Sequence, residues 1–407
     1  MLYNHQKQFL TENPDKTTLV WSCGTGKTRA AIEWTHVDWS YAGEVLIICP
    51  KALKQNWRRE SLRWAKAGLP SLTMILSKEE FRRDWKTLPK FRQVVVDEVH
   101  NGFLTPMFKS QMSKALRDYL KKHNVPRVLL LSATVYTSSP WNIYNLAVFT
   151  GHNWNWKRFK ETFFYDVRMG PRLIPQVKKG SEAKLATLTK TIANVVDIHD
   201  VLDVPLQNHT EPEYFALSKE QITAIKDNYD PLPIVRYTAQ HEIENGILLG
   251  NEFRDLYTFQ CDKNERIAEL CKENKKVAVV CRYNAQIDML MDWVNEAGKP
   301  VFVIRGDVTN RDEITLKAEQ AEECVVLIQA DCAEGYQLPS FGLCVFASMS
   351  YSYTKWEQIC GRFLRMDKPS RTTFLYLLTE GDSIDQAVYD SVKKKEDFKI
   401  ALYEKRS

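Results

Sequence analysis

Short apolar runs recur along the chain, and segments long enough for helices separate them. The runs rich in β-forming residues are 17–21, 45–49, 72–76, 94–96, 128–131, 277–281, 301–304, 325–328, 343–347 and 373–378. Apolar and polar residues do not alternate within them, which is typical of parallel strands covered on both faces. Two such series, one in each half, predict an α/β fold with two domains in tandem.

The middle of the chain, residues 151–257, is less regular. Residues 154–164 predict an amphipathic helix, and glycine-containing stretches at 170–171 and 178–181 predict breaks. The stretch 203–208, which carries Pro205, is the expected hinge. We therefore expect a first domain over 1–203, with a helical segment at 151–203, and a second over 204–407.

A glycine-rich turn follows the first apolar run and precedes a predicted helix. Gly24 and Gly26 would let the backbone approach a ligand closely, and backbone N–H groups there, with that of Thr25, can bind phosphate. Lys27 would reach the terminal phosphates and the Thr28 hydroxyl a Mg²⁺ ion. A nucleotide site is predicted, although the pattern alone also permits a turn with a surface lysine.

Two other apolar runs end in polar residues. Asp97 and Glu98 follow the run 94–96, and ligands bind at this end of strands in open α/β sheets. Asp97 would hold Mg²⁺, and Glu98 would orient or deprotonate an attacking water; capping of a following helix is the alternative. Ser132 and Thr134 end the run 128–131, where an N-cap is also possible.

A cationic helix face is predicted in the second half. Gln358, Arg362 and Arg365 recur at helical spacing, and guanidinium groups suit phosphate oxygens. The alternative is a solvated face whose arginines pair with Glu357 or Asp367.

Composition narrows the classes of protein. The 407 residues are 44% apolar and 26% charged, as in ordinary globular proteins, and the net charge of +5 permits nucleic-acid binding without requiring it. The nine cysteines contain no C-x-x-C pair, so neither a zinc site nor a disulfide framework is expected. No apolar run approaches the roughly 20 residues that span a bilayer, and a cytoplasmic location is expected.

Taken in order, these stretches resemble superfamily-two helicases of the DExH kind, and within them the Swi/Snf-type DNA translocases. Further stretches are similar to motifs of that family: 3–6, the adenine-reading glutamine motif; 48–57, the first DNA-backbone motif; 77–84, the segment before the acidic motif; 130–134, the motif coupling ATP to DNA; 305–307, a turn before a helix; 333–338, a motif lining the ATP and DNA cleft; and 383–389, the closing helix. Trp21, in place of a small residue, is one departure that leaves the subfamily open.

The resemblance implies two tandem RecA-like parallel-sheet domains with the ATP cleft between them. It implies that Gln6 binds the adenine and that Gly335 and Gln358 also belong to the nucleotide site. Arg362 and Arg365 would enter this site from the second lobe, with Arg365 favoured as the arginine finger. Ser132 and Thr134 would couple ATP to DNA. The DNA contacts would be Lys51, Asn56, Ser77 and Arg305. A basic run from Trp57 to Lys66 could also lie near the bound DNA strand, or it could be a solvated helix face.

The expected function is a nucleic-acid-stimulated ATPase, a DNA helicase or translocase that uses ATP and Mg²⁺ as a monomer. Its partner would be single-stranded, duplex or branched DNA, and no association with a membrane is expected. The compact size is similar to phage or bacterial helicases of recombination, replication and repair, which implies the host cytoplasm for a phage protein. An RNA helicase, the motor subunit of a restriction system and an ATP-gated binding switch remain alternatives, although Glu98 and the two arginines favour turnover.

Overall fold

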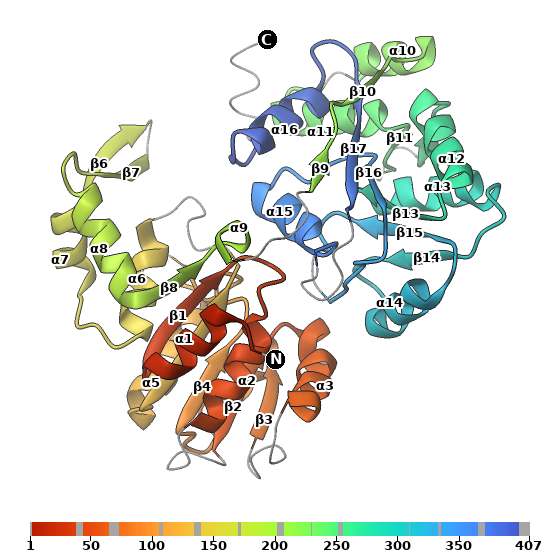
Figure 1. The fold of residues 1–407 in the computed structure, drawn as a ribbon. Coiled ribbons are helices and arrows are strands. Elements are labelled where there is room, and N and C mark those ends of the chain that lie inside the picture. The colour runs from red at the N-terminus through yellow and green to blue at the C-terminus, as the bar shows by residue number, and fades with distance from the viewer. Residues whose placement is uncertain are drawn as a thin grey trace. The chain divides into compact units, whose positions relative to one another are not determined.

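The chain folds into two compact units, residues Met1–Asp203 and Val204–Ser407. Figure 1 colours the first from red to yellow-green and the second from green to blue. The computed structural model describes residues 2–37, 44–64, 73–105, 109–133, 140–169, 172–201, 207–228, 230–250, 255–308, 310–332, 335–364 and 371–398. The expected hinge around Pro205 and the break at 170–171 lie outside these ranges.

The first unit contains a six-stranded, all-parallel sheet. Its strand order is β3-β2-β4-β5-β1-β8. The strands are β1 (Lys16–Trp21), β2 (Val45–Cys49), β3 (Thr73–Ser77), β4 (Gln93–Val96), β5 (Arg127–Ser132) and β8 (Ala193–Val196). The five apolar runs predicted in the first half correspond to β1 to β5.

Helices cover both faces of this sheet. They are α1 (Asn4–Glu12), α2 (Lys27–Val37), α3 (Lys54–Trp64), α4 (Lys78–Asp84), α5 (Gln111–His123), α6 (Pro140–Phe149), α7 (Trp156–Phe163), α8 (Glu182–Ile192) and α9 (Ile198–Val201). Successive strand residues face opposite cores: Val128 and Leu130 pack with α5 and α7, whereas Leu129 and Leu131 pack with α1, α2 and α3. This alternation explains why the strands are continuously apolar.

An antiparallel hairpin departs from the parallel pattern of the first unit. It consists of β6 (Phe164–Met169) and β7 (Arg172–Val177), and it follows α7. The helix predicted at 154–164 is α7, and the break predicted at 178–181 is the turn before α8.

The second unit contains a seven-stranded parallel sheet. Its order is β10-β17-β16-β13-β15-β14, with β9 also paired to β17. The strands are β9 (Asn208–His209), β10 (Glu213–Phe215), β13 (Lys276–Cys281), β14 (Val301–Ile304), β15 (Cys324–Gln329), β16 (Leu343–Phe346) and β17 (Thr373–Thr379). The predicted α/β fold with two parallel sheets in tandem is confirmed.

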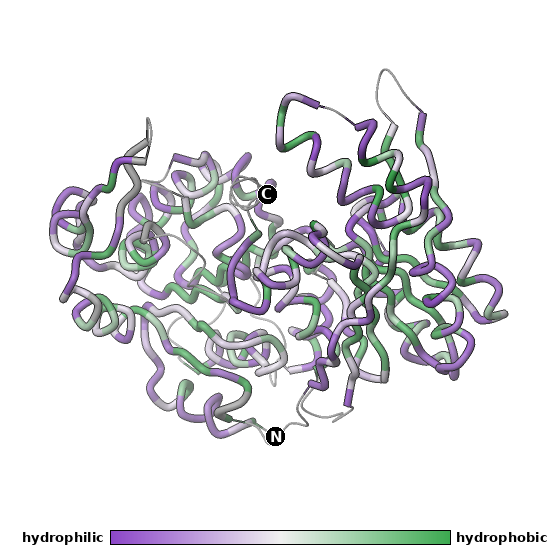
Figure 2. The backbone as a smooth tube through the Cα atoms, turned by 90° about the horizontal axis from the view of Figure 1, so that it is seen from above, coloured by the Kyte–Doolittle hydropathy of each residue, from purple (hydrophilic) through white to green (hydrophobic). Residues whose placement is uncertain are grey.

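Helices cover the second sheet in the same way. They are α10 (Lys219–Asp227), α11 (Pro233–Glu244), α12 (Asp262–Glu273), α13 (Asn284–Asn295), α14 (Arg311–Gln320), α15 (Tyr353–Gly361) and α16 (Ile384–Lys393), with a small antiparallel pair β11 (Ile247–Leu248) and β12 (Tyr257–Thr258). Apolar residues concentrate along the strands in Figure 2, and polar residues along the helices. Over the described ranges, no helix is both long and apolar enough to span a membrane.

Candidate active site

Three strands of the first unit carry the predicted motifs to one edge of the sheet. β5 lies between β1 and β4, and all three are parallel. Because the carboxyl ends of parallel strands meet at the same edge, the glycine turn after β1, the acidic pair after β4 and Ser132 at the end of β5 are neighbours in the sheet order.

The glycine turn links β1 to α2. Gly24 and Gly26 both have φ of +82°, a conformation that glycine adopts readily and other residues rarely do. The buried Thr25 hydroxyl donates to the Ser22 carbonyl at 2.7 Å. Lys27 begins α2, and its Nζ donates to the carbonyl of Trp21 at 2.6 Å and to that of Ser22 at 3.2 Å. The ammonium group therefore lies over the turn, and the adjacent Thr28 is half-buried on the same helix end.

Gln6 packs directly against this turn. Its side chain is fully buried, with Nε2 donating to the Gly26 carbonyl at 3.1 Å and Oε1 accepting from the Tyr3 N–H at 2.9 Å. His5 Nε2 lies 2.9 Å from the Thr25 carbonyl. A Cβ at Gly26 would lie 2.4 Å from Gln6 Nε2, so a larger residue there would require Gln6 to move. Two consecutive side chains of α1 thus hold the turn, although the sequence pointed to Gln6 alone.

Asp97 and Glu98 form the acidic part of the site. Both are buried; Asp97 Oδ2 accepts from the Trp57 indole N–H at 2.8 Å, and Oδ1 accepts from the Glu98 N–H at 2.9 Å. Burial and the charge of Glu98 raise the pKa of Asp97 to about 6, while Trp57 and Lys27 oppose this rise. Residues 97–105 contain no helix, so the alternative that this pair caps a following helix is wrong.

His100 connects the acidic turn to β5. Its Nδ1 lies 3.4 Å from Glu98 Oε2 and 2.9 Å from the Ser132 hydroxyl, and Ser132 is fully buried. A carboxylate, an imidazole and a hydroxyl therefore link the ends of two adjacent strands. The sequence assigned no role to His100, and Thr134 lies outside the described residues.

Two buried side chains from predicted DNA motifs also touch the acidic turn. Trp57, on α3, binds Asp97 as described, and Lys78, at the start of α4, donates to the carbonyls of Glu98 at 2.9 Å and Asn101 at 3.1 Å. Both were missed as site residues. The one signal for Lys78 is its position within the segment 77–84, and Trp57 was grouped with a basic run although its indole is buried.

The three predicted DNA contacts of the first unit lie at or after the carboxyl ends of β2 and β3, which are adjacent. Lys51 is exposed at the start of the short 3₁₀ helix Lys51–Leu53, and Asn56 accepts from Arg59 at 2.8 Å. Ser77 is buried and is the N-cap of α4, where its hydroxyl accepts from the Glu80 N–H at 3.2 Å. Their role as DNA contacts stays a prediction.

The predicted residues of the second unit follow three strands of its parallel sheet, β14, β15 and β16. The Arg305 guanidinium binds Asp288 at 2.7 Å and Asp307 at 2.9 Å, and the hydrogen bond that it donates to Asp288 raises the pKa of Arg305. Gly335 has φ of +86°. Gln358 is buried on α15, and Arg362, at the end of that helix, accepts at its carbonyl from the Leu338 N–H at 2.9 Å. Arg365, Asp367, Ala333 and Glu334 lie outside the described residues.

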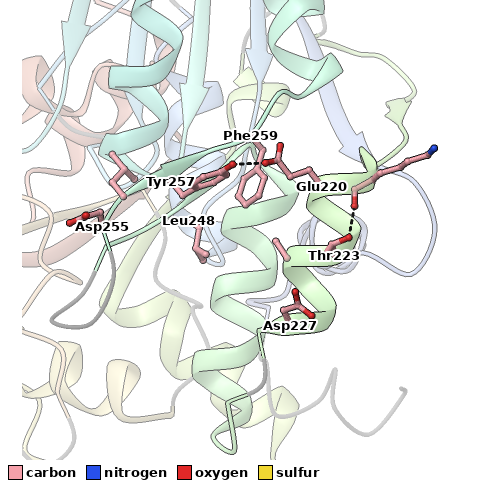
Figure 3. Close-up of a pocket in the computed structure, with 10 residues that line it drawn as sticks. Glu220, Thr223, Asp227, Leu248, Asp255, Tyr257 and Phe259 are labelled. Carbon is pink, nitrogen blue, oxygen red and sulfur yellow. Dashed lines mark hydrogen bonds between the residues drawn. The ribbon is translucent and has the colours of Figure 1, made fainter.

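A surface cavity in the second unit contains none of the predicted site residues (Figure 3). It has a volume of about 690 Å³ and is lined by Lys219, Glu220, Thr223, Ala224, Asp227, Leu248, Asp255, Leu256, Tyr257 and Phe259. The Tyr257 hydroxyl donates to Glu220 across one side of it. The cavity therefore contributes nothing to the chemistry predicted from the motifs.

Comparison with known proteins identifies part of the second unit. Residues 262–367 match the model of the helicase conserved C-terminal domain. This part of the second unit is similar to a helicase C-terminal domain. The matched segment includes Arg305, Gly335, Gln358 and Arg362.

One solved structure matches over the whole length of the chain. The Sulfolobus solfataricus SWI2/SNF2 ATPase core in complex with dsDNA matches 100% of this chain and 92% of its own, with 16% sequence identity and a TM-score of 0.45. Comparison with curated protein sequences returned no match.

Proposed function

We propose that the protein is an ATP-dependent DNA translocase or helicase. One observation carries this proposal: the glycine turn with Lys27 and the buried Asp97–Glu98 pair follow strands on either side of β5, in a chain whose residues 262–367 match the helicase conserved C-terminal domain. A phosphate-binding turn and a pair of carboxylates at one sheet edge are what hydrolysis of a nucleoside triphosphate requires.

The residues present fit ATP and Mg²⁺. The glycine turn leads into the N-terminus of the eleven-residue helix α2, and a helix N-terminus favours anions. Thr28 and Asp97 supply the oxygen ligands that Mg²⁺ prefers. The bound ion would neutralise phosphate charge. Lys27 would exchange its two carbonyl partners for phosphate oxygens, and Gln6 would read the base.

Glu98 is the proposed general base. It would orient and deprotonate the attacking water, and His100, whose Nδ1 lies 3.4 Å from Glu98 Oε2, would help to hold the carboxylate in place. Arg362 and Arg365 would complete the site from the second unit, with Arg365 as the finger. An arginine supplied in this way raises phosphoryl-transfer rates by about 10³–10⁵. Hydrolysis would then depend on closure of the two units and would drive movement along DNA.

Steady-state ATP hydrolysis with a panel of nucleic acids tests this proposal. The panel consists of blunt duplex DNA, forked DNA, a Holliday junction and RNA, with a control that lacks nucleic acid. Strand displacement is measured in parallel. We expect DNA to stimulate hydrolysis most, forked or branched DNA above blunt duplex, and binding to weaken steeply with salt. Stronger stimulation by RNA would make the protein an RNA helicase, and binding without turnover would make it an ATP-gated switch.

The panel also addresses the restriction-motor alternative. A motor subunit of that kind would hydrolyse ATP on blunt duplex DNA and displace no strand from a fork. The proposed role on branched DNA in recombination, replication or repair predicts the opposite preference.

A further inference from the structure

A buried indole joins a predicted nucleic-acid segment to the predicted Mg²⁺ ligand. Trp57 is 1% exposed, and its Nε1–H donates to Asp97 Oδ2 at 2.8 Å, although the two residues are 40 positions apart. Trp57 follows Asn56 directly and lies on α3, which continues from the 3₁₀ helix that begins at Lys51. The same short segment therefore presents polar residues at the sheet edge and inserts one donor into the acidic site.

A second link runs in parallel. Lys78 follows Ser77 directly, is 4% exposed, and donates from Nζ to the Glu98 carbonyl at 2.9 Å. A 2.6 Å ion pair between Lys54 and Glu80 joins α3 to α4. The two helices that carry predicted nucleic-acid contacts are thus tied to each other, and each holds one residue of the acidic pair.

We propose that Trp57 is a positioning residue that makes the binding of Mg²⁺–nucleotide depend on nucleic acid bound along Lys51–Trp64. The inference rests on the proposed function, because it needs both ligands. Asp97 has one oxygen fixed by the Glu98 N–H and the other by Trp57, so a small displacement of α3 reorients the carboxylate. Packed interfaces move between discrete positions. The contact between Trp57 and Asp97 is therefore suited to communicate to the nucleotide site whether nucleic acid is bound.

Coupling of this kind is reciprocal. If nucleic acid changes nucleotide affinity by some factor, nucleotide changes nucleic-acid affinity by the same factor, and such factors are commonly about 5- to 150-fold. Two binding titrations therefore measure one quantity, and they do so without turnover.

The experiment compares Trp57→Phe, Trp57→His and Trp34→Phe with the wild type in the full chain. Phenylalanine keeps a ring without the donor, whereas histidine keeps a ring N–H at the position equivalent to Nε1. Trp34 is the matched control, because it is fully buried in the same core and its indole donates to the Pro14 carbonyl at 3.0 Å. Thermal unfolding reports the stability of each variant.

The readout is the affinity of a fluorescent, non-hydrolysable ATP analogue with Mg²⁺, with and without saturating duplex DNA. The affinity for DNA is then measured with and without the analogue. We expect a coupling factor of at least about fivefold in the wild type. It should fall to near one in Trp57→Phe and be kept in Trp57→His and Trp34→Phe. DNA affinity without nucleotide should be unchanged in Trp57→Phe.

An unchanged coupling factor in Trp57→Phe overturns the inference, as does an equal loss in Trp34→Phe, which would show a general effect of weakened packing. If Trp57→Phe does not fold, Trp57→His decides, with kept coupling supporting the inference and lost coupling overturning it. Failure of the proposed function is distinguishable, because ATP hydrolysis by the wild type would then not be stimulated by DNA.

Discussion

His100 joins the acidic turn to the neighbouring strand, since its Nδ1 lies 2.9 Å from the hydroxyl of Ser132. The same ring nitrogen is 3.4 Å from Glu98 Oε2. A change at the end of β5 can therefore reach the proposed general base through a single imidazole. This is a physical route for the coupling role that the sequence assigned to Ser132.

The first prediction concerns Ser132→Ala. Removal of the hydroxyl frees the imidazole from β5, so we expect the nucleic-acid-stimulated part of ATP hydrolysis to fall about fivefold, corresponding to the ~1 kcal/mol of one hydrogen bond. Hydrolysis without nucleic acid and nucleotide affinity should change little. Ser113→Ala, which removes another fully buried hydroxyl of the first unit, is the control. Equal loss in both variants would argue against a specific role for Ser132.

The second prediction concerns the ammonium group over the glycine turn. Lys27→Ala should lower ATP hydrolysis by on the order of 10²–10³, as does removal of one preorganised donor from other active sites. DNA affinity in the absence of nucleotide should stay near the wild-type value. The exposed Lys7 on α1 supplies a control with the same loss of charge, Lys7→Ala. Full hydrolysis by the Lys27 variant would show that the phosphate site lies elsewhere.

The strands β1 to β5 and β13 to β17 were predictable because each reads as an uninterrupted apolar run, whereas the parallel edge strand β8, which is partly exposed, was missed. The hairpin β6–β7 was not, since it mixes apolar residues with Asp166, Arg168 and Pro175 and gives no continuous run. The short strands β9 and β10 were also missed. Both pair with β17 about 160 residues later, and two or three residues give no periodicity to read.

The site was predictable where its parts are local in sequence. Glycine turns and carboxylates that follow strands are recognisable from local sequence patterns, and parallel topology brings them to one edge of the sheet. The residues that position them could not be recognised from the sequence, because the contacts of Trp57 with Asp97 and of His100 with Ser132 span 40 and 32 residues. No pattern along the chain encodes which buried donor meets which acceptor across a sheet.

The third prediction separates two reasons for a glycine. Gly26 and Gly180 have φ of +82° and +85°, but a Cβ at Gly26 meets Gln6 at 2.4 Å, whereas one at Gly180 meets nothing within 4 Å. Gly180→Ala should cost only the left-handed backbone penalty of about 1–2 kcal/mol in unfolding free energy. Gly26→Ala should cost more and also weaken nucleotide binding, because Gln6 must move. Urea unfolding and nucleotide titration measure both, and equal effects at the two positions would contradict the contact seen here.

The fourth prediction concerns a buried carboxyl group in the second unit. Glu244, at the end of α11, is 1% exposed, and its two oxygens accept from the N–H groups of Ile384 and Asp385, each at 3.0 Å. Burial and then the charge of Asp385 raise the pKa of Glu244 from 4.5 to about 8, against the effect of these donors. The folded chain thus keeps a proton that the unfolded chain loses near pH 4.5.

The sign of the pH dependence follows from this difference. Below about pH 4.5 both states bind the proton and the stabilisation is complete; as pH rises through about 8 the folded state also loses it, and the stabilisation disappears. Glu244→Gln cannot titrate, so the unfolding free energy of the wild type minus that of Glu244→Gln should decrease between pH 4.5 and 8. Urea unfolding at several pH values, followed through the transition that the variant shifts, measures this difference. A difference that grows with pH would mean that the donors at Ile384 and Asp385 outweigh burial and that Glu244 is ionised in the folded protein.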